Sequence, residues 1–372
     1  MISPGIAAVA AVLDAPGTPV TLRGLPVPQP AAGELIVDIE YGGICGTDLH
    51  LQDGHLAIPT PVTLGHEGLG VVAATGAADV IDGNGRLLSV GDRVMWASSV
   101  SCGRCSACAD QLEPTLCSRR QTYGVNRTVT ADSGPTGSWA ERIRLHRDVT
   151  VVKLPDEVDS LSAMSLACAG PTMVHALVDR WTIKPGDVVI VQGSGPVGFA
   201  AAALAELSGA RQVILVGGPA NRLALAESIG LGTAHVNVIE GDRQAALAEA
   251  VRLTGDAYGA DVVVECTGVP TAIAEGLRLV RRGGAYVVVG QYTDSGDTVI
   301  NPHQIVFRQL TVVGSWAFTG SHLVKYVNLL PQLTRRFDIG QMVSVFPLKD
   351  VDEAMRSARA GDVVKAVLGV GR

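Results

Sequence analysis

The sequence has 372 residues, of which 47% are hydrophobic and 17% are charged, and its formal net charge at pH 7 is −7. This length accommodates two domains of ordinary size, and the composition excludes a disordered chain. The acidic balance argues against a nucleic-acid partner, because phosphate binding requires a basic surface. No apolar run approaches the ~20 residues of a membrane-spanning helix.

The first 17 residues are largely apolar, but no basic residue precedes Arg23. A β-strand is therefore a better interpretation than a secretory signal peptide, whose start is positively charged. Four of the seven cysteines lie within residues 102–117. In a chain with no export signal this spacing indicates metal thiolates rather than disulfides, and we expect a cytoplasmic protein.

Up to about residue 150 the chain consists of short β runs separated by glycine and proline, among them 34–43 and 68–76. The run 34–43 leads into "ICGTDLH", in which four side chains can bind metals or move protons: Cys45, Thr47, Asp48 and His50. The segment 65–67 adds His66 and Glu67, and Cys168 follows later. Each of these residues alone is unremarkable, since single cysteines and histidines are often core residues. Together Cys45, His66 and Cys168 offer two thiolates and one imidazole, a set that binds catalytic zinc and leaves a fourth position open.

Two C-x-x-C steps and a later thiol form a compact group: Cys102, Cys105, Cys108 and Cys117. Four thiolates can surround one tetrahedral Zn²⁺ and close its coordination sphere, so such a site is structural. An iron–sulfur cluster is the alternative for any set of four thiolates.

From about residue 187 the pattern changes to β runs that alternate with helical segments of 10–15 residues, which predicts a doubly wound parallel sheet. The run 188–192 is followed by a G-x-G-x-x-G motif that opens an alanine-rich helix. This context is the one required of a dinucleotide-binding loop, in which the phosphate meets the helix N-terminus. The motif comprises Gly193, Ser194, Gly195, Pro196, Val197 and Gly198.

The cofactor's adenosine ribose is expected at the end of the second β run, about 20 residues further on. That run ends in Gly217 and Gly218, and no acid follows before Glu227. A carboxylate there would repel a 2′-phosphate, whereas Arg222 lies close enough in sequence to bind one. The sequence therefore slightly favours NADP(H) over NAD(H).

These motifs together resemble the zinc-dependent alcohol dehydrogenases of the medium-chain dehydrogenase/reductase (MDR) superfamily. The resemblance covers essentially the whole chain, because Cys45–His50, Gly65–Glu67, the 102–117 lobe, Cys168 and Gly193–Gly198 occur in the family's order. It implies an α/β protein with a GroES-like, β-rich catalytic domain and a Rossmann domain, with the active site in the cleft between them. The expected domains are 1–169 with 313–372, including a structural zinc lobe at 98–120, and 170–312.

The resemblance also implies residue roles. Cys45, His66 and Cys168 match the catalytic zinc ligands, and Glu67 matches a transient extra ligand. Asp48 matches the acceptor that orients the ligand histidine. Thr47 and His50 match a proton relay that passes through the nicotinamide ribose. Further positions are expected to contact the cofactor: Gly217, Thr267, Gly290 and, at the pyrophosphate, Lys365. We therefore expect two zinc ions per chain, one catalytic and one structural.

Several alternatives remain at this point. Polyol and threonine dehydrogenase-like members commonly carry a carboxylate where this chain has Cys168. A zinc-free enone or quinone reductase would lack the ligand set, and a non-catalytic nucleotide-binding protein would not need the relay. Three tryptophans hint at a hydrophobic or cyclic alcohol or carbonyl substrate, although packing explains each of them equally well: Trp96, Trp139 and Trp316. The family resemblance further implies a homodimer or homotetramer.

Overall fold

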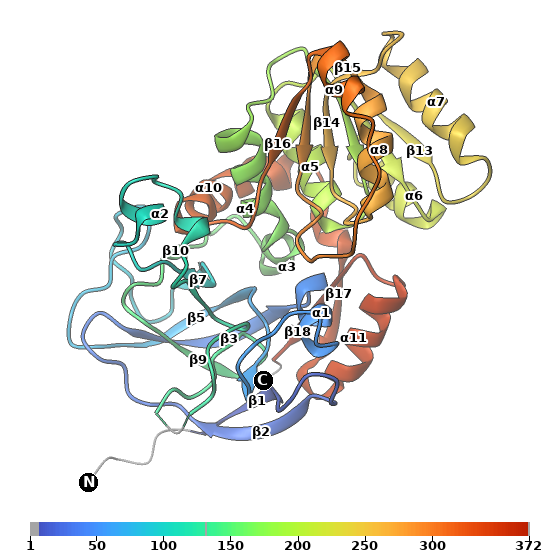
Figure 1. The fold of residues 1–372 in the computed structure, drawn as a ribbon. Helices are drawn as coiled ribbons and strands as arrows, with labels where there is room; N and C mark the ends of the chain where they lie inside the picture. The colour runs from blue at the N-terminus through green and yellow to red at the C-terminus, as the bar shows by residue number, and fades with distance from the viewer. Residues whose placement is uncertain (1–6, 131, 371–372) are drawn as a thin grey trace. The chain divides into compact units, whose positions relative to one another are not determined.

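The computed structural model describes residues 7–130 and 132–370 (Figure 1). The chain forms two compact units. Unit 1 contains Met1–Cys168, Phe318–Pro331 and Gly340–Arg372, and unit 2 contains Ala169–Ala317 and Gln332–Ile339. The predicted division was 1–169 with 313–372 against 170–312, whereas Ala169, residues 313–317 and residues 332–339 group here with unit 2.

Unit 1 consists mainly of β-strands. Its larger sheet has the order β10-β6-β5-β3-β18-β17, with β9 also pairing with β3, and a second sheet has the order β2-β1-β4. The strands are β1 (Ala7–Leu13), β2 (Thr21–Pro26), β3 (Leu35–Gly43), β4 (Val62–Thr63), β5 (Gly68–Thr75), β6 (Arg93–Trp96), β7 (Ser99–Val100), β8 (Gln121–Thr122), β9 (Arg142–Leu145), β10 (Val151–Lys153), β17 (Val343–Pro347) and β18 (Lys365–Gly369).

The last strand of the chain completes the larger sheet beside a strand near its start. Strand β18 pairs antiparallel with β3, with Val367 opposite Gly43, and pairs parallel with β17. The chain therefore returns, after unit 2, to the strand that leads into Cys45.

Helices cover parts of unit 1. They are α1 (Gly46–Gln52), α2 (Ser106–Ala109), η1 (Pro114–Leu116), α3 (Ser160–Ser165), η3 (Ile339–Met342), η4 (Leu348–Asp350) and α11 (Val351–Ala360). Helix α10 (Gly320–Arg336) contributes residues to both units, and η3 begins at the last residue of unit 2. Met355 of α11 packs in a core cluster with Leu51 of α1 and with Leu64, so apolar burial holds these two helices against the sheet.

Unit 2 contains a parallel sheet with the order β13-β12-β11-β14-β15-β16. Its strands are β11 (Val188–Gln192), β12 (Gln212–Gly217), β13 (Ala234–Asn237), β14 (Ala260–Glu265), β15 (Val280–Val288) and β16 (Thr311–Gly314). Its helices are α4 (Ala169–Val174), η2 (His175–Arg180), α5 (Pro196–Leu207), α6 (Ala220–Ser228), α7 (Arg243–Thr254), α8 (Pro270–Leu279) and α9 (Pro302–Arg308). All residues of β11 are buried, as expected for a strand covered on both faces. The predicted fold class, a β-rich unit and a Rossmann-like unit, is confirmed.

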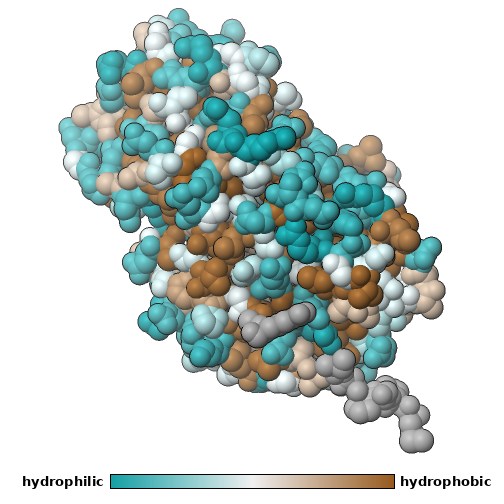
Figure 2. Space-filling view, turned by 180° about the vertical axis from the view of Figure 1, so that it is seen from behind, coloured by the Kyte–Doolittle hydropathy of each residue, from teal (hydrophilic) through white to brown (hydrophobic). Residues whose placement is uncertain are grey.

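Within the residues that the structure describes, no helix is both long enough and apolar enough to span a membrane. On the face drawn in Figure 2, hydrophilic and hydrophobic residues are interspersed in small groups.

Candidate active site

Four predicted residues meet in one cluster inside unit 1: Cys45, His66, Glu67 and Cys168. Their ligand atoms all lie within 4.8 Å of one another. Cys45 is the N-cap of α1, directly after β3, whereas His66 and Glu67 lie between β4 and β5. Cys168 follows α3. A tetrahedral site with Zn–ligand bonds of about 2.0–2.3 Å has edges of about 3.3–3.8 Å, so these donors fit one zinc ion.

Asp48 lies behind this cluster and contacts two of its members. The side chain is completely buried, and its Oδ1 lies 3.2 Å from His66 Nδ1. Its Oδ2 accepts a hydrogen bond of 2.8 Å from the backbone N–H of Cys45. The second contact caps the first turn of α1, because Asp48 is the N3 residue of that helix. One carboxylate therefore fixes the ring of His66 and the backbone of Cys45 together.

The two thiols of the cluster titrate as a pair. The hydrogen bond from Cys168 lowers the pKa of Cys45 well below its ordinary value, although burial opposes this effect. The same hydrogen bond, together with burial, raises the pKa of Cys168 well above its ordinary value. Two buried thiols that share one proton behave in this way. Without a cation, repulsion between two thiolates keeps one of the thiols protonated. A divalent cation would remove this repulsion and allow both thiols to bind it as thiolates.

Burial alone would lower the pKa of His66, but the neighbouring Asp48 carboxylate and the two cysteines outweigh burial and raise it well above its ordinary value. The pocket around this ring is therefore strongly electronegative. Such a pocket favours any cation that binds the ring, whether a proton or a metal ion.

Lys365 lies beside this cluster, in the first position of β18. Its side chain is 3% exposed, and its ammonium group forms an ion pair with the Glu67 carboxylate and donates to Ile44 O at 3.2 Å. The sequence pattern did not reveal that Lys365 and Glu67 would pair, and the expected contact of Lys365 with a pyrophosphate stays a prediction.

The two expected relay residues lie on α1. Thr47 is half-buried, and its Oγ1 is 3.9 Å from Cys45 Sγ. His50 is also half-buried and lies one turn further along the helix. Residues three apart on a helix lie on neighbouring parts of its surface, so the two side chains share one side of α1.

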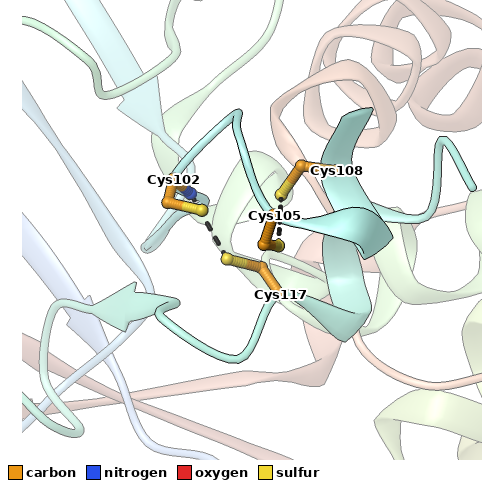
Figure 3. Close-up of side chains that lie close together, drawn as sticks. All are labelled: Cys102, Cys105, Cys108 and Cys117. Atoms are coloured by element: carbon orange, nitrogen blue, oxygen red, sulfur yellow. Dashed lines mark hydrogen bonds between the residues drawn. The ribbon is translucent and has the colours of Figure 1, made fainter. Parts of the chain in front are cut away.

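The four cysteines of the lobe point toward one another in unit 1 (Figure 3). Their Sγ atoms lie within 4.8 Å of one another, and those of Cys105 and Cys108 are 3.4 Å apart. The backbone N–H of Cys102 donates to Cys117 Sγ at 3.3 Å. Hydrogen bonds, the strongest from the backbone of Arg104, lower the pKa of Cys102 to about 6, and burial raises that of Cys108 to about 11. A tetrahedral Zn–thiolate site has edges of about 3.8 Å, so this lobe also fits one zinc ion.

The glycine motif of unit 2 forms the turn between β11 and α5. Gly193 has φ = +117°, which favours glycine, and a Cβ on Gly198 would overlap the Gly193 carbonyl. Gly195 is the N-cap of α5 and has open space where its Cβ would lie, and Pro196 and Val197 begin the helix. The backbone N–H groups at this helix end are therefore accessible to a phosphate, and the loop fits a dinucleotide.

Ser194 connects this loop to the end of β12. Its hydroxyl donates to Gly218 O at 2.7 Å and accepts from Gly218 N–H at 3.0 Å. A Cβ on Gly217 would lie 2.7 Å from Ser194 Oγ, so the glycine makes room for the serine. Arg222 is half-buried on α6, and burial lowers its pKa.

An acid that the sequence analysis missed lies near the start of α6. The Glu240 carboxylate, from the segment after β13, accepts a hydrogen bond of 3.3 Å from Ala220 N–H. No local motif marks this residue, because it reaches the site from 20 residues further along the chain.

A second missed residue, Glu265, organises the other two predicted cofactor positions. Its Oε1 accepts from Thr267 N–H and Oγ1, both at 2.6 Å, and from Gly268 N–H at 2.9 Å. Its Oε2 accepts from Gly290 N–H at 3.1 Å. Glu265 is fully buried at the end of β14. A charged residue directly after the apolar run 262–264 was the available signal.

The three tryptophans differ in their surroundings. Trp139 is fully buried in unit 1 and donates from Nε1 to Gly43 O at 2.8 Å, and Trp96 is 4% exposed. Trp316 is 39% exposed in unit 2 and stacks on Tyr292, with ring centroids 5.7 Å apart. Only Trp316 of the three therefore offers an aromatic face at the surface of its own unit.

Two family models match the chain. Residues 31–156 match the alcohol dehydrogenase GroES-like domain, and residues 196–332 match the zinc-binding dehydrogenase domain. The curated 5-exo-hydroxycamphor dehydrogenase of Pseudomonas putida is 29% identical over 349 residues, which cover 92% of this chain and 94% of the relative. The sorbitol dehydrogenase of Halalkalibacterium halodurans is 30% identical over 351 residues, covering 92% and 93% of the two chains.

Solved structures agree with these relatives. An alcohol dehydrogenase from Thermotoga maritima superposes with a TM-score of 0.92 at 30% identity, covering 98% of this chain and 100% of the other. A zinc-binding dehydrogenase from Sinorhizobium meliloti, bound to NADP, superposes with a TM-score of 0.83 at 30% identity, covering 98% and 99%. With both cysteine sites and the dinucleotide loop, these similarities indicate zinc and a nicotinamide cofactor. The chain therefore belongs to the zinc-type alcohol dehydrogenases of the MDR superfamily, and it is an oxidoreductase that acts on alcohols.

Proposed function

We propose that this enzyme oxidises a hydrophobic, ring-containing alcohol, and reduces the matching carbonyl compound, with one catalytic and one structural zinc ion per chain. The observation that carries this proposal is the cluster of Cys45, His66 and Cys168 with the buried Asp48 behind it. Two thiolates and one imidazole, oriented by Asp48, would leave one coordination position of a tetrahedral zinc ion open for a substrate hydroxyl. We assign unit 1 as the catalytic domain and unit 2 as the cofactor-binding domain.

Each residue of the cluster has a task in this proposal. Cys45, His66 and Cys168 would hold the metal, and Asp48, which contacts His66 Nδ1, leaves Nε2 of that ring to serve as the donor. Zinc in such a site is a Lewis acid that lowers the pKa of a bound hydroxyl, and nicotinamide accepts the hydride. Glu67, at the edge of the cluster and paired with Lys365, is placed to approach the metal as an extra ligand.

The proton of the substrate hydroxyl leaves by way of α1. Thr47 lies next to Cys45, so its hydroxyl is placed to take that proton and to donate its own to the relay. His50 receives the proton and delivers it to solvent, because one nitrogen of an imidazole ring can accept a proton while the other donates one.

The lobe cysteines hold the second zinc. Four thiolates complete a tetrahedron, so this metal binds no substrate and stabilises the 102–117 segment. A stoichiometry of two zinc ions per chain follows.

The cofactor preference is proposed from the end of β12. Gly217 provides no carboxylate, and Arg222 provides a cation at the start of α6, which together favour NADP(H). Glu240 works against a 2′-phosphate in the same region. We therefore expect Arg222→Gln to raise the KM for NADP more than the KM for NAD, and Glu240→Gln to lower the KM for NADP. Equal effects on both cofactors would contradict this preference.

The substrate class is proposed from Trp316 and from Cys168. The stacked Tyr292 and Trp316 rings give unit 2 an exposed aromatic surface suited to an apolar ring. A thiolate at Cys168, in place of the carboxylate common in polyol and threonine dehydrogenases, favours a simple alcohol over a polyol. The similarity to a hydroxycamphor dehydrogenase supports the same class. A homodimer or homotetramer is the assembly that the family resemblance implies.

A panel of alcohols followed by nicotinamide absorbance, with both cofactors, tests the proposal together with a metal count. We expect turnover of cyclic secondary alcohols, weaker turnover of sorbitol and threonine, and two zinc ions per chain. A preference for sorbitol or threonine would contradict the substrate class. One zinc per chain without turnover of any alcohol would contradict the catalytic site itself.

A further inference from the structure

A second histidine lies directly behind the proposed relay residue. His50 Nδ1 and His55 Nδ1 are 3.1 Å apart, and the two ring centroids are separated by 5.4 Å with the planes tilted by 49°. Two facing Nδ1 atoms at this distance share a single proton, since one ring must donate and the other accept. The Nε2 atom of each ring stays available for another partner.

The end of α1 creates this pair. Asp53 is the C-cap, and Gly54 follows in the left-handed conformation with φ = +80°. His55 N–H donates to His50 O at 3.0 Å, and Gly54 N–H donates to Leu51 O at 3.2 Å. These are the two hydrogen bonds of the Schellman motif, which places the side chains of the C″ and C3 residues, here His55 and His50, in contact.

The chemistry of this contact is unusual for the motif. The C″ and C3 residues of a Schellman motif frequently form a hydrophobic contact. Here both positions hold imidazoles, so an apolar contact is replaced by a hydrogen bond between two rings that can each accept and donate a proton. Capping the helix does not require two histidines, and the pair therefore calls for a reason beyond folding.

The pair runs from the half-buried side of α1 to solvent. His50 is half-buried, whereas His55 is exposed. The adjoining turn is held by Arg359 of α11, which donates to Asp53 Oδ1 at 2.7 Å and to Gln52 Oε1 at 3.3 Å. The other charged groups that line the cavity at this helix end are Asp352 and Arg356.

We propose that His55 is the last member of the proton relay and acts through His50; this inference rests on the proposed alcohol oxidation. A proton that arrives at His50 Nε2 makes this ring an imidazolium. The ring then releases its Nδ1 proton to His55 Nδ1, and His55 releases its Nε2 proton to water. One proton enters and one leaves. Exchange of the ring protons with water then restores the starting tautomers.

Two substitutions of His55 separate proton transfer from positioning. In His55→Asn the amide oxygen lies near the place of Nδ1 and can accept from His50, but it cannot carry the proton on. His55→Leu supplies the apolar contact that the motif usually has, so the helix end is retained. His146→Asn, which removes a partly exposed histidine elsewhere in unit 1, is the matched control.

The first measurement is the single-turnover rate at which reduced nicotinamide forms at low buffer concentration, with and without added imidazole. The second is nitrogen NMR of the tautomers of the two rings. We expect both His55 variants to be slower by about 3–10-fold at low buffer concentration, with the rate restored by imidazole, because a mobile base replaces the missing one. The control keeps the wild-type rate. In the wild-type spectrum we expect a proton shared between the two Nδ1 atoms.

Three results would overturn the relay role of His55. Both variants could turn over at the wild-type rate in low buffer. His55→Asn could match the wild type while only His55→Leu is slow, which would show positioning by a hydrogen bond. Both could be slow without rescue by imidazole, which would show a structural defect. A wild-type chain that oxidises no alcohol overturns the proposed function, and this role of His55 with it.

Discussion

The ammonium group of Lys365 forms an ion pair with the carboxylate of Glu67 inside unit 1, although 298 residues separate the two in sequence. The side chains are 3% and 2% exposed. Burial alone would lower the pKa of Lys365, but the Glu67 carboxylate outweighs burial and raises it. The pair thus keeps a charged lysine beside two thiols and a carboxylate, where an uncompensated charge of either sign would be costly.

We expect Lys365→Met to destabilise the fold by about 3–5 kcal/mol, because it leaves a buried carboxylate without its partner. The double variant with Glu67→Gln should be less destabilised than Lys365→Met alone. Denaturant unfolding of the wild type, both single variants and the double variant measures the coupling. Additive effects of the two substitutions would contradict an energetically coupled pair.

The pH dependence of the same variant has a defined sign. The folded-state pKa of Lys365 lies above the ordinary value of 10.5, so its pairing stabilises the protein fully below pH 10.5. This stabilisation is lost as the pH rises through the raised pKa. On the alkaline side, the difference in unfolding free energy between wild type and Lys365→Met should therefore decrease only above pH 10.5, as unfolding at increasing alkaline pH would measure.

The sequence predicted the metal cluster better than its surroundings. Cys45, His66 and Cys168 could be grouped because zinc restricts its ligands to a few residue types. The partner of Lys365 could not be predicted, since it depends on the register in which β18 pairs with β3. Pairing between strands so distant in sequence is set by tertiary packing, which no local pattern records.

The cofactor side and the relay show the same limit. The β run 260–265 predicted a strand, but not that the carboxylate of Glu265 would accept hydrogen bonds from Thr267 and Gly290. His55 was overlooked because its contact with His50 depends on the left-handed turn at Gly54. In each case the sequence shows the residue type, but it does not show the backbone geometry that directs the side chain.

Asp48→Asn should weaken catalytic metal binding. An amide presents one oxygen where the carboxylate presents two, so either His66 Nδ1 or Cys45 N–H loses its acceptor. Loss of such a supporting contact typically costs ~10–100-fold in metal affinity. Competition with a chelator measures the affinity, and Asp53→Asn, an exposed acid after the same helix, is the control. An unchanged affinity would show that Asp48 only caps α1.

After metal removal, the thiols of the lobe should differ in their reactivity toward an alkylating reagent. In the stripped protein, Cys102 has a pKa of about 6 and Cys108 one of about 11. A thiolate forms above its pKa, so at neutral pH Cys102 is mostly thiolate and Cys108 mostly thiol. Iodoacetamide followed by peptide mass spectrometry should label Cys102 first and Cys108 last, whereas zinc should protect both. Equal labelling would contradict the different environments of the two residues.

Glu265→Gln should loosen the cofactor-binding loops without unfolding unit 2. The substituted amide keeps one acceptor oxygen but places N–H donors at the other position, so either Thr267 and Gly268 or Gly290 loses its acceptor, and each buried donor left unpaired costs about 1–3 kcal/mol. We expect a lower unfolding temperature and about 10–100-fold weaker binding of the nicotinamide cofactor, since 1.4 kcal/mol corresponds to tenfold. Calorimetric titration measures the binding. Glu275→Gln, which removes the partner of Arg243 on the outside of the same unit, should leave binding unchanged. If the Glu265 variant bound the cofactor as tightly as the wild type, its carboxylate would serve only the local turns.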